Sequence, residues 1–300
     1  MSLWILVTLA AAVFQTLRFM LQKSLSTTRL SATGATFARF AYSAPIIAAV
    51  LAGYLMVSGR ELPPLSAAFW GYALTGGLGQ ILATICVVAL FKQRNFAVGI
   101  MFKKTEVIQT VLVGLLILGE GVSWAGFGAI LIGLTGVLTL SKSPGGTGHW
   151  WQHLTNRAAV LGLGSGVLFA ISGVTYRAAS LELSGLEPVF RAGITLAAVT
   201  SAQMIAMGAW LAWRDRDELR AVWGARRTAL WVGLFSMGGS FCWFIAFTLQ
   251  TVAYVKALGQ VELIFSMLAS VLFFRERIAA REVAGIALLG ASILLLVLVA

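Results

Sequence analysis

The sequence predicts an all-α integral membrane protein, and three observations carry this prediction. Hydrophobic residues make up 59% of the 300 residues, charged residues only 11%, and the mean hydropathy is +0.90. Such a composition leaves too little polar surface to cover a water-soluble globule. The apolar residues occur in runs of about 20, which is the length of a helix that crosses a bilayer. Breaks rich in Gly, Pro or charged residues separate these runs.

The breaks divide the chain into ten expected transmembrane helices. In chain order these spans are Leu3–Leu25, Thr33–Val57, Ala68–Phe91, Phe96–Leu118, Trp124–Leu140, Ala158–Arg177, Pro188–Trp213, Ala229–Thr248, Val252–Phe274 and Arg281–Val299. The chain therefore leaves no room for a separate soluble domain.

The basic residues between the spans predict the orientation of the chain in the membrane. Fourteen of them lie in the odd-numbered connections: Lys23, Arg29, Lys92, Arg94, Lys142, Arg157, Arg214, Arg216, Arg220, Arg226, Arg227, Arg275, Arg277 and Arg281. The even-numbered connections hold only Arg60 and Arg177. Cytoplasmic connections are enriched in Lys and Arg, so we expect the odd connections inside and both termini outside. The same distribution explains the net charge of +11, so this charge does not indicate binding to nucleic acid.

The two halves of the chain resemble each other. A shift of 156 residues (262 − 106 = 156) aligns four pairs without a gap: Cys86 with Cys242, Phe91 with Phe247, Glu106 with Glu262 and Glu120 with Glu276. We therefore expect two five-helix repeats, residues 1–143 and 158–300, joined by a connection at 144–157. His149 and His153 lie in that connection, beside two tryptophans suited to the membrane interface, and we expect no metal site there.

An odd number of spans in each repeat forces the second copy to insert upside down relative to the first. Inverted repeats of this kind often form secondary transporters, whose substrate site lies near the bilayer midplane where the repeats meet. The segments TEVIQTVLVGLLILGEGVSW (105–124) and VELIFSMLASVLFFRERIAA (261–280) close the two halves in a similar way. With these motifs the chain resembles the drug/metabolite transporter (DMT) superfamily, and most closely its ten-helix EamA-type members.

This resemblance implies a carrier or exchanger of small metabolites, driven by protons or another gradient. It also implies a cavity lined mainly by the first, third and fourth helices of each half. Many members of the superfamily keep their termini in the cytoplasm, whereas the charges of this chain predict termini outside. The resemblance therefore predicts no direction of transport.

Charged and polar side chains inside the spans are the candidate substrate-binding residues, because ionisable groups within a membrane usually face one another or a wet pathway. They are Arg18, Arg39, Lys103, Lys104, Glu106, Thr110, Arg191, Lys256, Gln260, Glu262 and Ser266. The alternative for Glu106 and Glu262 is a purely structural role in docking the two halves. Arg39 and Arg191 hold corresponding places, and either could instead extend to the lipid headgroups. The excess of positive groups in the spans favours an anionic or zwitterionic solute.

The two glutamates differ in their expected neighbours. Lys103 precedes Glu106 by one helical turn, and Gly259 takes the corresponding place before Glu262. We therefore expect Glu106 to stay in a fixed ion pair and Glu262 to be the proton-coupling group of the carrier.

Other classes of function lack support in the sequence. Neither a nucleophile motif nor a zinc-protease motif occurs, so we expect no catalytic residues, no metal, no cofactor and no enzyme activity. The expected partners are a small-molecule substrate and the lipid bilayer, with no nucleic acid, in a monomer or homodimer. The expected location is the inner (plasma) membrane of a bacterium. A lipid or amphiphile flippase, or a multidrug-type exporter, on the same fold is the alternative function.

Overall fold

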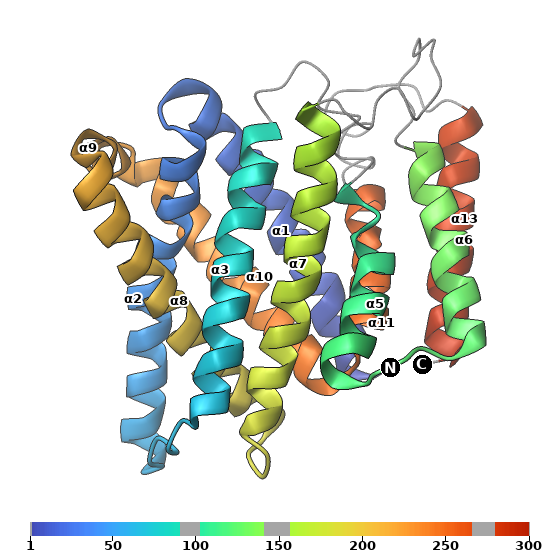
Figure 1. The fold of residues 1–300 in the computed structure, drawn as a ribbon, viewed down its shortest axis with the longest axis horizontal. Coiled ribbons are helices and arrows are strands. Elements are labelled where there is room, and N and C mark those ends of the chain that lie inside the picture. Colours follow the sequence, from blue (N-terminus) through green and yellow to red (C-terminus); the bar gives the residue numbers. More distant parts are fainter. Residues whose placement is uncertain (1, 91–102, 141–156, 266–279, 300) are drawn as a thin grey trace.

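The computed structural model describes residues 2–90, 103–140, 157–265 and 280–299, and the described chain is helical, without strands (Figure 1). Its helices are α1 (Leu3–Thr28), α2 (Ala32–Ser58), α3 (Ala67–Leu90), α5 (Glu106–Leu118), α6 (Trp124–Leu140), α7 (Arg157–Glu182), α8 (Pro188–Arg214), α9 (Arg216–Gly224), α10 (Arg226–Leu249), α11 (Val252–Leu258), the 3₁₀ turn η2 (Gly259–Val261) and α13 (Ala280–Val299). The expected all-α class is confirmed. The connection at 144–157, with His149 and His153, lies outside the described residues.

Local signals in the sequence set several helix ends. The Ser31 side chain accepts a hydrogen bond from the backbone N–H of Gly34 at 3.0 Å and so caps α2. Asp215 caps α9 in the same way. Pro188 occupies the first turn of α8, where its missing N–H costs nothing. Helix α5 ends at Gly119, whose φ of 66° is a conformation that favours glycine.

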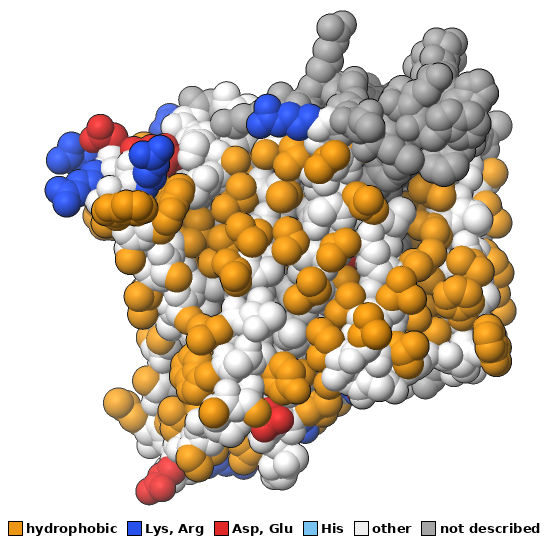
Figure 2. Space-filling view, viewed as in Figure 1, with side chains coloured by type: hydrophobic (Ala, Val, Ile, Leu, Met, Phe, Trp, Pro, Cys, Tyr) orange, Lys and Arg blue, Asp and Glu red, His pale blue; other side chains and the backbone are white. Residues whose placement is uncertain are grey.

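In the part of the chain that the structure describes, six helices are long and apolar enough to cross a membrane: α1, α2, α3, α7, α8 and α10. Hydrophobic side chains cover the middle of the face shown in Figure 2, and most charged side chains visible there lie toward its upper and lower edges. This arrangement is that of a multi-pass membrane protein. The remaining expected spans are shorter helices or run into residues that are not described, so the ten-span count stays a prediction.

The connections between helices divide between two sides of the molecule. The α1–α2 connection and α9 lie at the upper side in Figure 1, whereas the α2–α3 and α7–α8 connections lie at the lower side with both marked termini. Helix α9 is held there by Glu218, whose carboxylate accepts a hydrogen bond from the Ser31 backbone N–H at 2.7 Å. The basic α9 segment and the termini therefore lie on opposite sides.

Helices from the two halves of the chain pack against each other in reciprocal pairs. Helix α1 packs on α10 and α3 on α7, while α2 packs on α8, α5 on α11 and α6 on α13. The α6–α13 contact is especially close, because a Cβ added at Gly136 would lie 2.9 Å from the carbonyl oxygen of Gly285. The interior of the protein is thus built between the halves.

The fourth and ninth expected spans are not continuous α-helices. A turn at Lys104 and Thr105 precedes α5, and η2 interrupts the chain after α11 before helix resumes at Glu262. The two breaks correspond under the 156-residue shift, since 104 + 156 = 260 and 105 + 156 = 261, and both sums fall within η2. Close packing explains the glycine at the second break, because a Cβ on Gly259 would meet the Trp243 ring at 2.5 Å.

Candidate functional site

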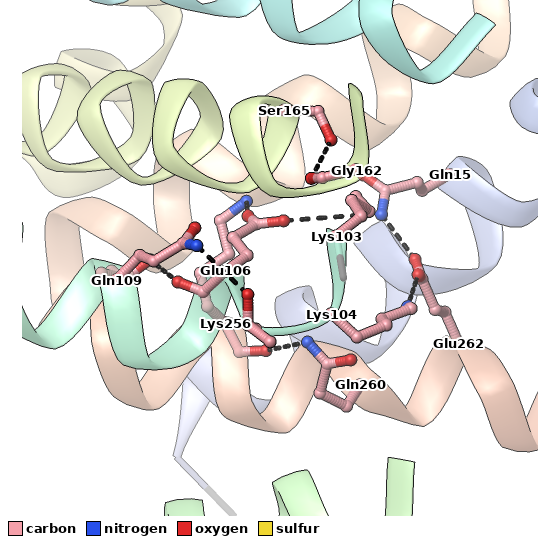
Figure 3. A network of polar contacts seen from close by, with 12 residues as sticks. Gln15, Lys103, Lys104, Glu106, Gln109, Gly162, Ser165, Lys256, Gln260 and Glu262 are labelled. Atoms are coloured by element: carbon pink, nitrogen blue, oxygen red, sulfur yellow. Dashed lines mark hydrogen bonds and ion pairs between the residues drawn. The ribbon is translucent and has the colours of Figure 1, made fainter. Parts of the chain in front are cut away.

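Glu106 lies at the first break and binds two lysines (Figure 3). Its Oε1 lies 2.6 Å from the Nζ of Lys256, and its Oε2 lies 3.4 Å from the Nζ of Lys103. The Lys103 pair matches the expectation from the sequence. Lys256 makes the shorter contact and comes from the other half of the chain, where it belongs to α11. Because Glu106 opens α5, its charge also lies at the favourable end of the helix dipole.

Glu262 lies at the second break and is bound from the first half of the chain. The Nζ of Lys104 forms an ion pair and hydrogen bond with its Oε1. Gln15 of α1 donates from Nε2 to Oε2 at 2.5 Å, and Trp243 of α10 donates to the Oε1 of Gln15 at 3.2 Å. Gly259 takes the place before Glu262 that Lys103 takes before Glu106, yet Glu262 is in an ion pair as well. Its lysine comes from the other half of the chain rather than from the preceding turn of its own helix.

Aromatic rings surround the lysines of this network. The Nζ atoms of Lys103 and Lys256 lie 5.4 and 5.5 Å from the centre of the Phe169 ring. Lys256 also lies 5.1 Å from the Trp243 ring. Cations within about 6 Å of a ring face are attracted to it, and more strongly where water is excluded. The rings thus help to keep these ammonium groups inside the protein.

Arg39 of α2 reaches the interior rather than the headgroups. Arg39 is only 4% exposed, and its guanidinium donates to three hydroxyls: Ser236 at 2.6 Å, Ser240 at 3.0 Å and Thr84 at 3.2 Å. All three acceptors are neutral. The alternative that Arg39 extends to the membrane surface is therefore wrong.

Arg18 of α1 is a second buried guanidinium, also 4% exposed. It donates to the side-chain oxygen of Gln22 at 3.0 Å, and Gln22 in turn donates to the carbonyl of Ala35. Arg18 and Arg39 line the same small cavity. Two like charges held together inside a low-dielectric protein favour the binding of an anion between them.

Three small cavities connect these groups. The first, of about 20 Å³, lies among Gln15, Lys103, Glu106, Lys256 and Glu262. The second, of about 30 Å³, shares Gln15, Phe169, Trp243 and Lys256 with the first and adds both Arg18 and Arg39. The third, of about 10 Å³, shares Arg39, Gln80 and Ser240 with the second. Cavities of this size hold single water molecules and no larger solute.

The helices that line the first two cavities are those that the resemblance implied. Both cavities are lined by α1, α7, α10 and α11. The segment at the start of α5 also lines the first cavity, and α3 and Arg39 of α2 also line the second. The polar lining also contains residues outside the expected set, among them Gln15, Gln80 and Ser240. The side-chain oxygen of Gln80 accepts hydrogen bonds from Tyr176 at 3.1 Å and Gln203 at 3.0 Å. A glutamine inside an apolar span was the signal in the sequence that could have predicted these polar lining residues.

Three expected residues that the structure describes, Arg191, Thr110 and Gln260, stand apart from the charged network. Arg191 donates to the carbonyl of Ser180 at 2.8 Å and does not line the three cavities. Thr110 bonds back to the carbonyl of Glu106 within α5. Gln260 lines the first cavity but donates to the Lys256 carbonyl at 3.3 Å. Ser266 lies outside the described residues.

The helices and the charged interior together define a multi-pass membrane protein with a polar site between the halves of its chain. Residues 156–298 match the model of the EamA-like transporter family, which supports the expected DMT superfamily and a role as a membrane transporter. One solved structure, described as "Crystal structure of protein", is similar in fold over 97% of this chain and 99% of its own, with a TM-score of 0.66 and 17% identity. No curated protein matches the chain. Within its described part, the structure has no group of three or more His, Cys, Asp or Glu that could hold a metal ion.

Proposed function

We propose that the protein is a secondary transporter that moves a small anionic or zwitterionic metabolite by alternating access. One observation carries the proposal: the fourth and ninth spans exchange ion pairs. Lys104 of the first half binds Glu262 of the second, and Lys256 of the second half binds Glu106 of the first. These pairs hold the halves together around the central cavities, and a relative movement of the halves must stretch or exchange them.

Two further features support two inverted five-helix halves. The reciprocal packing of α1 on α10 and α3 on α7 is the pattern that a twofold relation between the halves produces. The helix breaks also fall at equivalent positions, and broken helices near the midplane are typical of transporter binding sites. We place the odd-numbered connections in the cytoplasm. Both termini then lie on the non-cytoplasmic side of a bacterial inner membrane.

The size of the cavities favours a carrier over an open pore. The three cavities hold only about 10, 20 and 30 Å³ in this conformation, which admits water but no metabolite. A solute therefore passes only if the helices around the cavities separate. Alternating access supplies that movement, whereas a fixed channel does not.

The charge balance favours an anion. The two carboxylates of the network are neutralised by Lys103, Lys104 and Lys256, which leaves one lysine charge in excess before the arginines are counted. Arg18 and Arg39 add two positive charges whose hydrogen-bond acceptors are neutral. Burying an uncompensated charge is costly, and a bound anion lowers that cost.

Uptake into proteoliposomes tests this function. The solutes are labelled carboxylates, phosphate esters, amino acids and organic amines, and the controls are protein-free liposomes and a Glu106→Gln/Glu262→Gln variant. We expect uptake of anionic or zwitterionic solutes by the wild type and much slower uptake by the variant. Uptake of amines alone, or no uptake above protein-free liposomes, would overturn the proposal.

A further inference from the structure

We infer that the cavity around Arg18 and Arg39 is a binding site for an organic carboxylate that carries an aromatic ring. This inference rests on the proposed function and specifies its substrate class. It draws on two properties of the cavity that the charge balance alone does not contain. The described part of its lining has no acidic side chain, and its wall holds several aromatic rings.

Among the residues that the structure describes, the lining of this cavity holds three cations and no carboxylate. The cations are Arg18, Arg39 and Lys256. Lys256 already binds Glu106, and Glu262, which lines the neighbouring cavity, already binds Lys104. The charges that remain for a ligand are thus the two guanidiniums. A planar guanidinium matches a carboxylate, since two of its N–H groups can donate to the two oxygens.

The wall facing these arginines is aromatic. Five rings line the cavity: Phe169, Tyr176, Trp243, Phe244 and Phe247. They form two touching pairs, with Trp243 stacked on Phe247 at 5.6 Å between ring centres and Tyr176 tilted against Phe244 at 4.6 Å. A ligand ring that enters among them gains the same offset or edge contacts that the pairs now make with each other.

The same lining disfavours the other common small solutes. A free amino acid carries an ammonium group, which here would meet cations and no carboxylate. The ammonium group of an organic amine would be repelled by the three cations. A small anion such as acetate would satisfy the arginines but is too small to cover the rings. An aromatic carboxylate satisfies both parts of the site.

The present cavity is too small for such a ligand, with about 30 Å³ of space. The ring must therefore enter a conformation in which α10 has moved away from α1 or α7, displacing the water between them. This requirement follows from alternating access and places the ligand at the contact between the two halves of the chain.

Calorimetric titration of the purified protein in detergent tests the site with four matched probes. The probes are 3-phenylpropanoate, 3-cyclohexylpropanoate, 3-phenylpropylamine and phenylalanine. We expect 3-phenylpropanoate to bind about 2–10-fold more tightly than its cyclohexyl analogue, from the usual size of aromatic contacts. We expect phenylalanine to bind more weakly still and the amine not to bind. Equal affinity for the two carboxylates, or tighter binding of the amine or of phenylalanine, would overturn the inference.

Variants locate the binding. Arg39→Gln should weaken binding of 3-phenylpropanoate at least 5-fold, whereas Arg191→Gln, the matched arginine outside the cavity, should leave it unchanged. Trp243→Leu should remove most of the preference for the phenyl ring, and Trp124→Leu, at a residue that is 90% exposed, should not. If Arg39→Gln fails to fold, Arg39→Lys and the comparison of Trp243→Leu with Trp124→Leu still test the site. Unchanged binding in Arg39→Lys and an unchanged phenyl preference in Trp243→Leu would contradict the site.

Proteoliposome uptake separates this inference from the proposed function. Binding of 3-phenylpropanoate without uptake of any solute in the panel would support the site and contradict the carrier. Uptake of other anions without binding of 3-phenylpropanoate would support the carrier and contradict the site.

Discussion

Lys104 and Glu262 are 158 residues apart in the chain and form a buried ion pair at two helix breaks. Each residue lies in or beside the interruption of its own span, and each break corresponds to the other under the 156-residue shift. The pair therefore joins equivalent parts of the two halves of the chain. Lys256 and Glu106 repeat the connection with the charges exchanged between the halves.

Removing one member of the buried pair should destabilise the protein more than removing both. Glu262→Gln leaves the Lys104 charge without its partner, and we expect a loss of about 3–5 kcal/mol in unfolding free energy. The double variant Lys104→Met/Glu262→Gln should recover part of this loss. Equilibrium unfolding in mixed micelles measures both. Arg220→Gln, in an exposed pair with Asp217, is the control and should cost only about 0–1 kcal/mol. Additive losses in the double variant would show that the pair is not coupled.

Arg39 and Arg191 should differ in their effect on solute binding, although the sequence aligns them. Arg39→Gln removes a guanidinium that lines two cavities, so binding of the transported anion should weaken by about 1–3 kcal/mol. Arg191→Gln should change binding by less than the error of the measurement. Calorimetry on both variants decides, and equal losses would place the anion elsewhere.

Glu262 remains the candidate for proton coupling, and Lys104 competes with the proton for its carboxylate. When the halves separate, a proton can replace the lysine as the counter-charge of this carboxylate. In proteoliposomes Glu262→Gln should keep solute exchange but lose acceleration by a pH gradient, whereas Glu106→Gln should mainly impair binding or folding. A Glu262→Gln variant that follows the gradient as the wild type does would contradict this role.

The charge distribution predicts which side of the membrane each connection faces. In a background without Cys86 and Cys242, a cysteine at Arg220 in α9 should react with an impermeant maleimide only after the cells are opened. A cysteine at Glu187 in the α7–α8 connection should react in intact cells. The reverse pattern would mean that both termini are cytoplasmic.

Much of this architecture was readable in the sequence, because apolar runs and capping residues act locally. The start of α8 at Pro188 was predicted, α2 begins one residue before the expected Thr33, and the Glu106–Lys103 pair follows from helical spacing. The partner of Glu262 did not follow, because Lys104 approaches it from a different helix and no local pattern encodes that contact. The contrast between Arg39 and Arg191 was hidden for the same reason, since only the packing of α2 against α10 brings Arg39 to Ser236 and Ser240.

A cross-link between the halves tests the central claim most directly. A Cβ built on Gly239 of α10 lies 3.0 Å from the Cβ of Phe14 of α1, near the spacing of about 3.5–4.5 Å that a disulfide needs. We propose a Phe14→Cys/Gly239→Cys variant without the native cysteines, reconstituted with the best-transported solute of the panel. If the halves move apart during transport, oxidation should abolish counterflow and reduction should restore it, while each single-cysteine variant stays active. Full counterflow in the completely cross-linked protein would contradict the account.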